Sequence, residues 1–497
     1  VEASGILAAS FDLSQTLPQV ADLCVREIAE YCAIVANGPR DGLFVEASAD
    51  SALRGQVVNA GAPLPEALRA LGLTTVITYP VCGRQEILGT FILASRDENA
   101  FGEQTRKLAN LITLQIANAL DQWALFERTH RVADRLQRAL LPESFPGAEG
   151  VQFFGAYRPA SDEAEVGGDW YDAFALPDGR IAVSIGDVAG HGLEAATVMG
   201  EIRQGMRSVA LSGQTPVEVL QHINGIINIR QSIGMVTAIF GYYEPQTRTL
   251  TYAVAGHPPP VVTIAAGRAA LLPGGGIPLG VVPEIDSRDW TITLPPASVV
   301  TFYTDGMTEF TRDVLAGEDT LLRACGGAAY LTAENPADAL QQTIFGTVQN
   351  RDDAAVLTLQ CEAGSVPAEM RYTAIPMIAP LIRASLQRFA DQNGLGEEDR
   401  FALTLAVGEA VANAVEHAYR GLTPGMLFIR THSDDHGITV RIEDQGRWRA
   451  FERREERGRG ITLMHEMMSG VRISSSQDRT TVILTLARNV EEQRNAS

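Results

Sequence analysis

The stretch Ile185-Gly-Asp-Val-Ala-Gly-His-Gly-Leu193 connects an apolar run typical of a strand to the helix-forming run Ala195-Ala-Thr-Val-Met199. Its three glycines allow sharp turns and let the backbone approach a ligand closely. The aspartate, at the expected end of the strand, is placed to point into a site. Taken alone, the stretch fits an ordinary strand–loop–helix connection with a solvated aspartate equally well.

Three further stretches in the middle of the chain have the same character: Glu165-Val-Gly-Gly-Asp-Trp-Tyr-Asp172, Tyr303-Thr-Asp-Gly-Met-Thr-Glu309 and Arg351-Asp-Asp-Ala-Ala-Val356. Each places an aspartate beside a glycine or at a strand boundary. Hard divalent cations prefer carboxylate and carbonyl oxygens as ligands. Two cations bridged by one carboxylate can activate a shared water for in-line attack on phosphorus. The four stretches together therefore predict a two-metal site.

Length and composition limit the classes of protein that the chain can be. Its 497 residues predict about three domains. It is 45% hydrophobic and 20% charged, as ordinary globular proteins are. It has no apolar run of about 18 residues, so we expect no membrane span. The net charge of −20 disfavours nucleic acid and anionic membranes as partners, because both would repel the chain.

The cysteines and the N-terminus bear on the compartment and on the extent of the chain. The five cysteines form no C-x-x-C pair, which argues against a disulfide framework or a zinc site and favours a reducing cytoplasm; they are Cys24, Cys32, Cys82, Cys325 and Cys361. The first residues lack an initiator Met and the basic region of a signal peptide. We therefore expect a trimmed end or the interior of a longer chain.

Periodicity predicts a mixed first segment and a long connecting helix. Residues 1–122 have helical spacing over 17–33, strands over 73–81 and 87–93, and a helix from 103 to 141 that Pro142 and Pro146 end. This helix joins the first domain to the next without a break. It is either a rod that transmits a signal or a plain spacer, and periodicity does not decide between the two.

The rest of the chain predicts two further α+β units. Between 153 and 359, two helices (193–212 and 216–230) interrupt short strands, which is typical of antiparallel sheets flanked by helices; the strands are 181–185, 237–243, 250–254, 299–303 and 355–359. Gly364-Ser-Val-Pro367 is a predicted linker. The last unit has predicted helices over 376–393, 397–419 and 458–468 and strands over 426–432, 437–443 and 480–487.

The ordered motifs VGGDWYD, GDVAGHG, AGHPPP, PLG, YTDGMTE and DDAAVL resemble the metal-dependent type 2C (PPM) Ser/Thr phosphatases, in particular their sporulation stage II E branch, over about 150–361. The resemblance implies an α-β-β-α layered fold and a centre of two Mn²⁺ or Mg²⁺ ions. It implies Asp187 as the bridging ligand and Asp353 as a substitute or support for Asp352; the implied ligands are Asp169, Asp187, Asp305, Asp352 and the Val188 carbonyl.

Two features of this region have plainer interpretations. We interpret His191 as a loop histidine that caps the following helix, and alternatively as a proton donor. Gly256-His-Pro-Pro-Pro260 and Pro278-Leu-Gly280 match the family but are interpreted as rigid turns with a structural role. Leu136-Gln-Arg-Ala-Leu-Leu-Pro142 resembles the helix that leads into these phosphatases.

The last unit contains a second set of polar motifs. Glu409, Asn413 and His417 follow at i, i+4 and i+8, so we expect them on one helix face. They are either the solvated side of the helix or, as carboxylate and amide, a site for nucleotide-bound Mg²⁺. Glu443-Asp-Gln-Gly446 follows a strand, and Arg457-Gly-Arg-Gly-Ile-Thr-Leu-Met464 opens a helix whose N-terminus favours phosphate.

Together these motifs resemble the GHKL ATPase family, in particular its Ser/Thr anti-sigma-factor kinases, over about 368–488. The resemblance implies an α/β sandwich that binds Mg-ATP, with Asn413 as Mg²⁺ ligand, Glu409 as base and Asp444 at the adenine amino group; the other implied ATP contacts are Gly446, Gly458, Gly460 and Thr480. Arg479 stands where the family usually has Gly, and the lid after Gly446 is short. We therefore expect ATP binding with slow phosphorylation, and Arg479 to crowd the adenine end.

The first segment resembles a GAF sensor domain in its pattern: a helix, the strands LTTVITYPV and EILGTFILASR, a turn and a long exit helix. No ligand-facing residue can be named. The alternative is a dimerisation module without ligand. Apolar positions repeat along the exit helix and predict pairing with a second copy; they are Leu108, Ile112, Ala119, Leu125, Val132 and Leu136.

These expectations describe a multidomain α+β bacterial signalling protein of the cytoplasm. We predict a GAF-like sensor over 1–122, a helical linker over 123–149, a phosphatase over 150–361 and a kinase over 368–488. By resemblance, it acts on a phosphorylated anti-sigma-factor antagonist and regulates a sigma factor by partner switching. The apolar face of the long helix predicts a homodimer. Two alternatives stay open. The C-terminal domain could only bind ATP or a sigma factor, or the whole chain could act as a scaffold.

Overall fold

The structure is a computed structural model of the chain. It describes residues 13–36, 43–50, 53, 64–84, 86–160, 167–230, 234–265, 267–311, 313–346, 352–419, 423–446, 459–476 and 479–488, without the side chains of 125–138. The chain divides into two compact units, Val1–Val132 and Ala133–Ser497. Within the described ranges, no helix is both long and apolar enough to cross a membrane.

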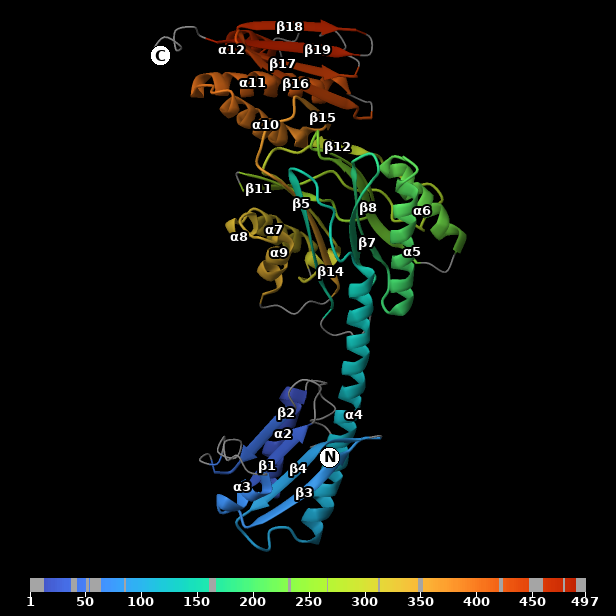
Figure 1. The fold of residues 1–497 in the computed structure, drawn as a ribbon, viewed down its shortest axis with the longest axis vertical. Coiled ribbons are helices and arrows are strands. Elements are labelled where there is room, and N and C mark those ends of the chain that lie inside the picture. Colours follow the sequence, from blue (N-terminus) through green and yellow to red (C-terminus); the bar gives the residue numbers. More distant parts are fainter. Residues whose placement is uncertain are drawn as a thin grey trace. The chain divides into compact units, whose positions relative to one another are not determined.

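The first unit is built on a four-stranded antiparallel sheet with the strand order β2-β1-β4-β3 (Figure 1). Helix α2 and the start of α4 pack on one face through residues such as Leu17, Phe91 and Ile116. Helix α3 covers the other face through Leu68. The elements are α2 (Leu13–Glu27), β1 (Tyr31–Ala36), β2 (Leu43–Ser48), α3 (Leu64–Ala70), β3 (Thr75–Cys82), β4 (Ile87–Ser95) and α4 (Glu103–Leu140).

One predicted element of this unit is wrong at its C-terminal end. Helix α2 ends at Glu27, so the helical spacing assigned to 17–33 runs into strand β1. Strand β1 lies between β2 and β4, and its first four residues are buried. A strand buried on both faces is a continuous apolar run, which periodicity alone does not distinguish from a buried helix. The predicted strands 73–81 and 87–93 are confirmed as β3 and β4.

Helix α4 confirms the long predicted helix. Of the apolar face predicted to pair with a second copy, however, some residues are buried in the first unit and others are exposed. Ile112 is 6% exposed and belongs to the core of the first unit, so it is not available to a second copy. Leu108, Leu111 and Leu114 are exposed instead. Ala119 packs against the same core, and the side chains of Leu125, Val132 and Leu136 lie outside the described residues.

In the second unit, residues 151–361 form two antiparallel sheets between two layers of helices (Figure 1). The five-stranded sheet has the order β11-β10-β13-β14-β5 and is covered by α7, α8 and α9. Strands β12-β9-β8-β7-β6 belong to the other sheet, which α5 and α6 cover. This is the predicted α-β-β-α arrangement.

The two predicted helices and the five predicted strands of this region are confirmed as α5, α6, β7, β8, β9, β13 and β14, whereas the other elements were not predicted. The strands are β5 (Val151–Arg158), β6 (Trp170–Ala175), β7 (Ile181–Val188), β8 (Val236–Glu244), β9 (Thr249–Ala255), β10 (Val261–Ile264), β11 (Arg268–Leu271), β12 (Trp290–Thr293), β13 (Val299–Tyr303) and β14 (Ala354–Cys361). The helices are α5 (Leu193–Ala210), α6 (Pro216–Arg230), α7 (Val314–Cys325), α8 (Ala328–Leu331) and α9 (Pro336–Phe345), with a 3₁₀ turn at Asp305–Met307.

The described part of the C-terminal region adds five strands and three α-helices. Helices α10, α11 and α12 pack with the sheet in one continuous core. The predicted helix 397–419 is α11 followed by a π-helical turn at Ala414–Ala418, a widening that is frequent at functional sites. The elements are β15 (Glu369–Thr373), α10 (Ala379–Gln392), α11 (Glu397–Asn413), β16 (Met426–Asp434), β17 (Gly437–Asp444), α12 (Arg459–Met467), β18 (Gly470–Ser475) and β19 (Thr480–Ala487).

A single ten-stranded sheet runs through both regions of the second unit. Strand β15 pairs with β16 on one side and with β12 on the other, at Tyr372 and Ile292. Side chains reinforce this short junction: the Arg371 N–H donates to Thr293 Oγ1 at 2.8 Å, and the Thr291 N–H donates to Thr373 Oγ1 at 2.9 Å. The predicted linker is therefore followed by a strand that joins the two regions.

An ion pair between the buried Asp172 and the partly exposed Arg207 holds helix α5 on the sheet. Arg207 Nε and Nη2 donate to the two carboxylate oxygens of Asp172, both at 2.6 Å. Asp172 is fully buried, and the guanidinium also lies 4.5 Å from the centre of the Phe174 ring. Removing one partner of such a pair leaves an uncompensated buried charge. The pair therefore fixes α5 against β6, the strand that Asp169 directly precedes.

Candidate metal centre and nucleotide site

The glycine-rich stretch of residues 185–193 is the connection from β7 to α5. Asp187 and Val188 end the strand, and the next residues turn back into the helix. Gly190 and Gly192 have φ angles of 108° and 88°, in the left-handed region that favours glycine. Gly192 is the N-cap residue of α5, so the interpretation of His191 as the helix cap is wrong.

Asp169 lies where three strands meet. It is 2% exposed, and its Oδ2 accepts a hydrogen bond from Thr304 Oγ1 at 2.7 Å. Thr304 follows β13, and its hydroxyl oxygen also accepts from the N–H of Ala355 in β14 at 2.9 Å. The carboxylate that precedes β6 is therefore tied to two strands of the other sheet.

A close backbone approach brings Asp169 beside the end of β7. The Val188 N–H donates to the Gly168 carbonyl at 3.3 Å. A Cβ at Gly168 would overlap the Val188 carbonyl oxygen and lie 3.1 Å from Asp187 Oδ1. Glycine is thus required here, and the structure brings Asp169, Asp187 and the Val188 carbonyl together as predicted.

The aspartates act on one another electrostatically. Burial, and next the charge of Asp305, raise the pKa of Asp187 to about 7. Burial, and next the charge of Asp352, raise the pKa of Asp305 to about 6. Burial and the charge of Asp187 raise the pKa of Asp169 well above its usual range. Like charges in a partly dehydrated recess favour a bound cation, which reverses these shifts.

Asp352 and Asp353 have different surroundings. Asp353 Oδ1 accepts from the Ala160 N–H at 3.0 Å, and its charge adds to burial in raising the pKa of Tyr157. Asp352 is exposed, and its Oδ1 accepts from the Asp353 N–H at 2.8 Å. These contacts suit Asp353 to the supporting role and Asp352 to that of a ligand.

The carboxylates do not form a closed cage. Among the described residues, no three acidic, histidine or cysteine side chains are gathered closely enough to enclose a metal ion. Mg²⁺ usually keeps several waters and takes only one or two carboxylates at a time. Single carboxylates that converge from two sheets, with a backbone carbonyl beside them, therefore fit a hydrated cation pair.

The predicted nucleotide residues meet at the end of α11 and the start of α12. A Cβ at Gly460 would lie 2.7 Å from Glu409 Oε2 and 3.7 Å from Asn413 Nδ2. The absence of a side chain at Gly460 therefore lets the N-terminus of α12 lie against the carboxylate and the amide. Gly458 lies outside the described residues.

Asp444 and Thr480 are paired neighbours on β17 and β19. Asp444 is 3% exposed and its Oδ1 accepts from the Gly446 N–H at 3.0 Å. Burial raises the pKa of Asp444, and hydrogen bonds from the N–H groups of Gly446 and Thr480 oppose this rise. Within the described part of the chain, the buried Thr480 hydroxyl has no hydrogen-bond partner. A bound base with polar edges would supply one.

Tyr419 is a residue of this site that the motifs did not indicate. Its hydroxyl donates to the Met426 carbonyl at 2.8 Å and accepts from the Gln445 N–H at 2.9 Å. It therefore ties the end of the π-helical turn to the loop after Asp444. Burial raises its pKa to about 12. In sequence it is one aromatic residue at the end of an apolar helix, so its only sequence clue is its position.

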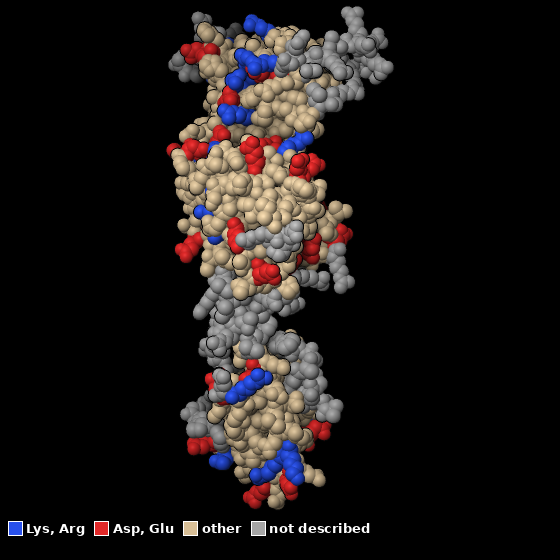
Figure 2. Space-filling view, turned by 90° about the vertical axis from the view of Figure 1, so that its right-hand side faces the viewer, with Lys and Arg blue, Asp and Glu red and all other residues tan. Residues whose placement is uncertain are grey.

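Arg479 does not crowd the adenine end, so that prediction is wrong. Its Nη1 lies 3.2 Å from Glu443 Oε1, and Arg441 and Arg430 contact the same carboxylate. Consecutive strand residues point to opposite faces, so Glu443 and Arg479 lie on the other side of the sheet from Asp444. Figure 2 shows Lys and Arg atoms interleaved with Asp and Glu atoms over this upper part of the molecule.

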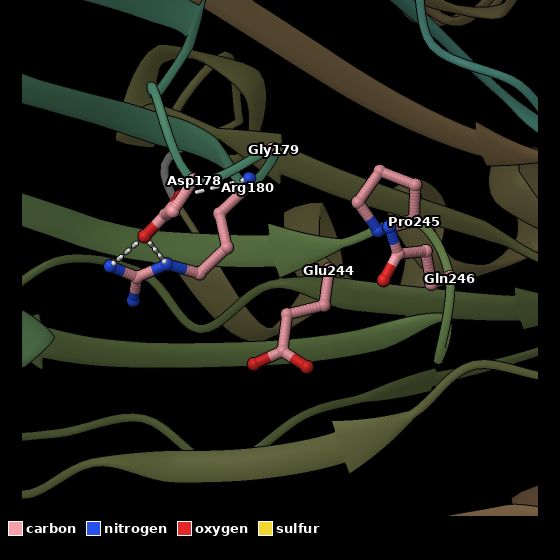
Figure 3. A pocket seen from close by; sticks show the side chains of 6 residues that line it. All are labelled: Asp178, Gly179, Arg180, Glu244, Pro245 and Gln246. Atoms are coloured by element: carbon pink, nitrogen blue, oxygen red, sulfur yellow. Dashed lines mark hydrogen bonds and ion pairs between the residues drawn. The ribbon is translucent and has the colours of Figure 1, made fainter.

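A shallow cavity of about 190 Å³ lies at the opposite end of β7 from Asp187 (Figure 3). Arg180 in its wall pairs with Asp178 at 2.7 Å and lies 4.4 Å from the centre of the Tyr242 ring. Its cation is thus already compensated, and the cavity belongs to neither candidate site; the lining residues are Asp178, Gly179, Arg180, Glu244, Pro245 and Gln246.

Comparison with known families assigns a class to each region of the second unit. Residues 177–362 match the family model of Stage II sporulation protein E (SpoIIE). Residues 373–486 match the model of the histidine kinase-like ATPase domain. The unit therefore combines a SpoIIE-type, type 2C phosphatase region with a GHKL-type ATPase region.

Individual relatives match the same two regions. Protein IcfG of Synechocystis is 25% identical over 42% of this chain and 36% of its own length. Phosphoserine phosphatase RsbU of Bacillus subtilis is 27% identical over 36% of this chain and 52% of its own length. Serine-protein kinase RsbW of Bacillus velezensis is 29% identical over 25% of this chain and 86% of its own length. The chain thus spans about half or less of IcfG and RsbU.

Among solved structures, the RsbU and RsbW domains of a Mycobacterium tuberculosis protein are similar to 70% of this chain and 96% of that one, with 27% identity and a TM-score of 0.41. The phosphatase domain of SpoIIE from Bacillus subtilis, with a fragment of its regulatory domain, matches 43% of this chain and 64% of that one, with 19% identity and a TM-score of 0.39.

The raised pKa values predict that the metal-free protein loses stability as pH rises. The carboxylates of Asp187 and Asp305 hold their protons more tightly folded than unfolded, so their contribution is complete below about pH 4 and is lost through about pH 6 to 7. We expect the thermal midpoint of the chelated protein to fall between about pH 5 and pH 8, and Mn²⁺ to reverse the fall.

Asp305→Asn should stabilise the chelated protein at the alkaline end by roughly 1–2 kcal/mol, because it removes one of the crowded charges. Asp319→Asn, in an exposed pair with Arg323, is the matched control and should leave the midpoint unchanged. Calorimetric scans across this pH range measure both. A midpoint of the chelated wild type that stays flat or rises would contradict the proposed crowding.

Proposed function

We propose that residues 150–361 are a metal-dependent protein serine/threonine phosphatase and that residues 368–488 are a kinase of the anti-sigma-factor type. The observation that carries the first part is the convergence of Asp169, Asp187 and Asp305 from the ends of two stacked sheets. The similarity to a phosphoserine phosphatase and to serine-protein kinases supports both parts.

In the proposed phosphatase site, two Mn²⁺ or Mg²⁺ ions would be held with Asp187 between them; the other ligands would be Asp169, Asp305, Asp352 and the Val188 carbonyl. When bound, the ions supply Lewis acidity and lower the pKa of a bound water. The Thr304 hydroxyl holds the Asp169 carboxylate in one orientation. The exposed His191, directly beyond β7, stays a candidate donor of a proton to the leaving serine oxygen.

Asp187→Ala should reduce dephosphorylation by more than about 100-fold, because it removes the carboxylate shared by both ions. The assay uses a phosphoserine protein and p-nitrophenyl phosphate in metal-free buffer with Mn²⁺ or Mg²⁺ added back. Asp178→Ala, at the other end of β7, is the matched control and should keep its activity. Full turnover by Asp187→Ala in chelator-treated buffer would contradict the metal mechanism.

In the proposed kinase site, Asn413 would hold Mg²⁺ of the bound ATP and Glu409 would accept the proton of the attacking serine. Asp444 and Thr480 would contact adenine, while Gly446, Gly458 and Gly460 would line the phosphates. The N-terminus of α12 favours these phosphates because its free N–H groups point outward. The proximity of Glu409 to Gly460 supports catalysis over the alternative of a module that only binds ATP or a sigma factor.

Asp444→Asn should weaken ATP binding at least about tenfold, because it replaces the buried acceptor for the adenine amino group with an amide. Arg479→Gly should change the affinity by less than about twofold, since that side chain pairs on the opposite face of the sheet. Titration calorimetry with Mg-ATP measures both. Tighter binding by Arg479→Gly would restore the crowding hypothesis, and no binding by the wild type at millimolar ATP would exclude the nucleotide site.

We further propose that the chain is a cytoplasmic homodimer. Its GAF-like first unit decides whether the phosphatase or the kinase activity is the greater. The proposed partners are a phosphorylated anti-sigma-factor antagonist and a sigma factor. Opposed activities on one serine would otherwise only consume ATP. A contact between α4 and α5 supports the transmission of a signal along α4 to the phosphatase region. Leu140 packs on Ala196, and its Cδ2 would lie 3.5 Å from a Cβ at Gly200 in α5. Helix α5 begins five residues after Val188.

Leu140→Gln in the full chain should change the phosphatase rate at saturating Mn²⁺ by at least about fivefold, as a coupling of about 1 kcal/mol implies. A point variant is preferable to a chain that begins at Gly150, because Leu141 is buried in the phosphatase core. Leu315→Gln, at an exposed position of α7, is the control. Light scattering gives the mass of each sample. An unchanged rate together with a monomeric mass would make α4 a spacer.

A further inference from the structure

The segment Gly256-His-Pro-Pro-Pro260 does more than turn the chain after β9. Gly256 has a φ angle of 65°, as the rigid-turn interpretation predicts. His257, however, points into the protein and is only 3% exposed. A histidine that is merely part of a turn has no need to be buried, so its partners define what it does.

Both ring nitrogens of His257 are hydrogen-bonded. Nε2 lies 3.0 Å from the Tyr303 carbonyl oxygen, and Nδ1 lies 2.8 Å from Thr237 Oγ1. A carbonyl oxygen can only accept, so Nε2 carries the hydrogen. Burial lowers the pKa of His257 to about 3, so the ring is neutral and Nδ1 accepts from the Thr237 hydroxyl. The two bonds therefore fix the tautomer and the orientation of the ring.

The two partners belong to different sheets. Thr237 is on β8, directly opposite Asp187 of β7 in the ten-stranded sheet. Tyr303 ends β13 of the five-stranded sheet and is followed by Thr304, which binds Asp169, and by Asp305. The imidazole of His257 thus spans the two stacked sheets at the level where the aspartates converge.

We propose that His257 is a positioning residue that sets the spacing between Asp187 and Asp305 and thereby the affinity of the centre for its two cations. This inference rests on the proposed phosphatase function. Apart from the Thr304–Asp169 bond near the start of β6, the sheets are packed largely through apolar side chains, which hold them together without fixing the offset of β8 from β13 closely. Two directional bonds to one rigid ring fix that offset, and a cation pair with ligands on both sheets depends on it.

The competing explanation is that His257 only stabilises the fold. A control variant separates the two. Tyr330 Oη lies 2.6 Å from Thr301 Oγ1, also on β13 and also buried, but Tyr330 comes from α8 and not from the other sheet. Tyr330→Phe therefore removes an equally buried bond on the same strand without loosening the link between the sheets.

The experiment measures Mn²⁺ binding to the full chain without substrate, by calorimetry and by electron paramagnetic resonance. His257→Phe should weaken binding by roughly 10-fold or more, the effect typical of losing a group that orients metal ligands. Thr237→Val, which removes one of the two bonds, should weaken it by a smaller factor. Tyr330→Phe should lower the thermal midpoint yet bind Mn²⁺ within about twofold of wild type. Nitrogen-15 spectra should show the neutral Nε2–H tautomer of His257.

Each outcome has one meaning. Unchanged Mn²⁺ affinity in both His257→Phe and Thr237→Val overturns the positioning role and leaves the phosphatase proposal standing. Wild-type protein that binds no Mn²⁺ overturns the phosphatase proposal itself. If His257→Phe does not fold, Thr237→Val alone decides, and wild-type affinity in that variant counts against the inference. A weakened affinity in Tyr330→Phe equal to that of His257→Phe would assign the effect to general destabilisation.

Discussion

The crowding of buried carboxylates is the constraint on which the phosphatase region depends. Asp169, Asp187 and Asp305 each cost free energy to ionise where they are, and the charges of Asp187 and Asp305 make ionisation of a neighbouring aspartate harder. A fold that only had to be stable would not bring them together. Three features around them hold this unfavourable arrangement in place: the Thr304 hydroxyl, the missing side chain of Gly168 and the partly buried pair of Arg207 with Asp172.

The nucleotide region also contains a buried carboxylate, but its burial costs less free energy. Asp444 is also buried, but two backbone N–H groups offset the cost, and Thr480 beside it keeps a hydroxyl without a partner among the described residues. Asp444 thus has hydrogen-bond partners within the protein, and the Thr480 hydroxyl needs a polar group of a ligand as its partner. The charged groups that would disturb it, Glu443 with its three arginines, are kept on the outer face by the alternation of the strand.

The sequence predicted features that neighbouring residues determine, and it did not predict features that depend on contacts between residues far apart in the chain. The aspartates were predictable, since each stands beside a glycine or at a strand boundary, and so were α5 and α6. His257 was not, because its partners lie 20 and 46 residues away and three prolines after it suggest only a turn. Strand β15 was missed because Glu369 and Arg371 interrupt it, so it lacks the near-continuous apolar run by which the equally short β13 was predicted. Arg479 was misjudged, since a family pattern gives the residue type but not the face on which it pairs.

The junction between β12 and β15 has a consequence for how the two regions would work together. One strand pair joins them into one sheet, with Asp187 on β7 at one part of that sheet and Asp444 on β17 at another. Because both regions also belong to one chain, the two proposed activities are always present in equal numbers. A cell could not shift their balance by synthesising more of one than of the other. The balance has to be set by the state of each molecule, which makes it a property of the chain and not of gene dosage.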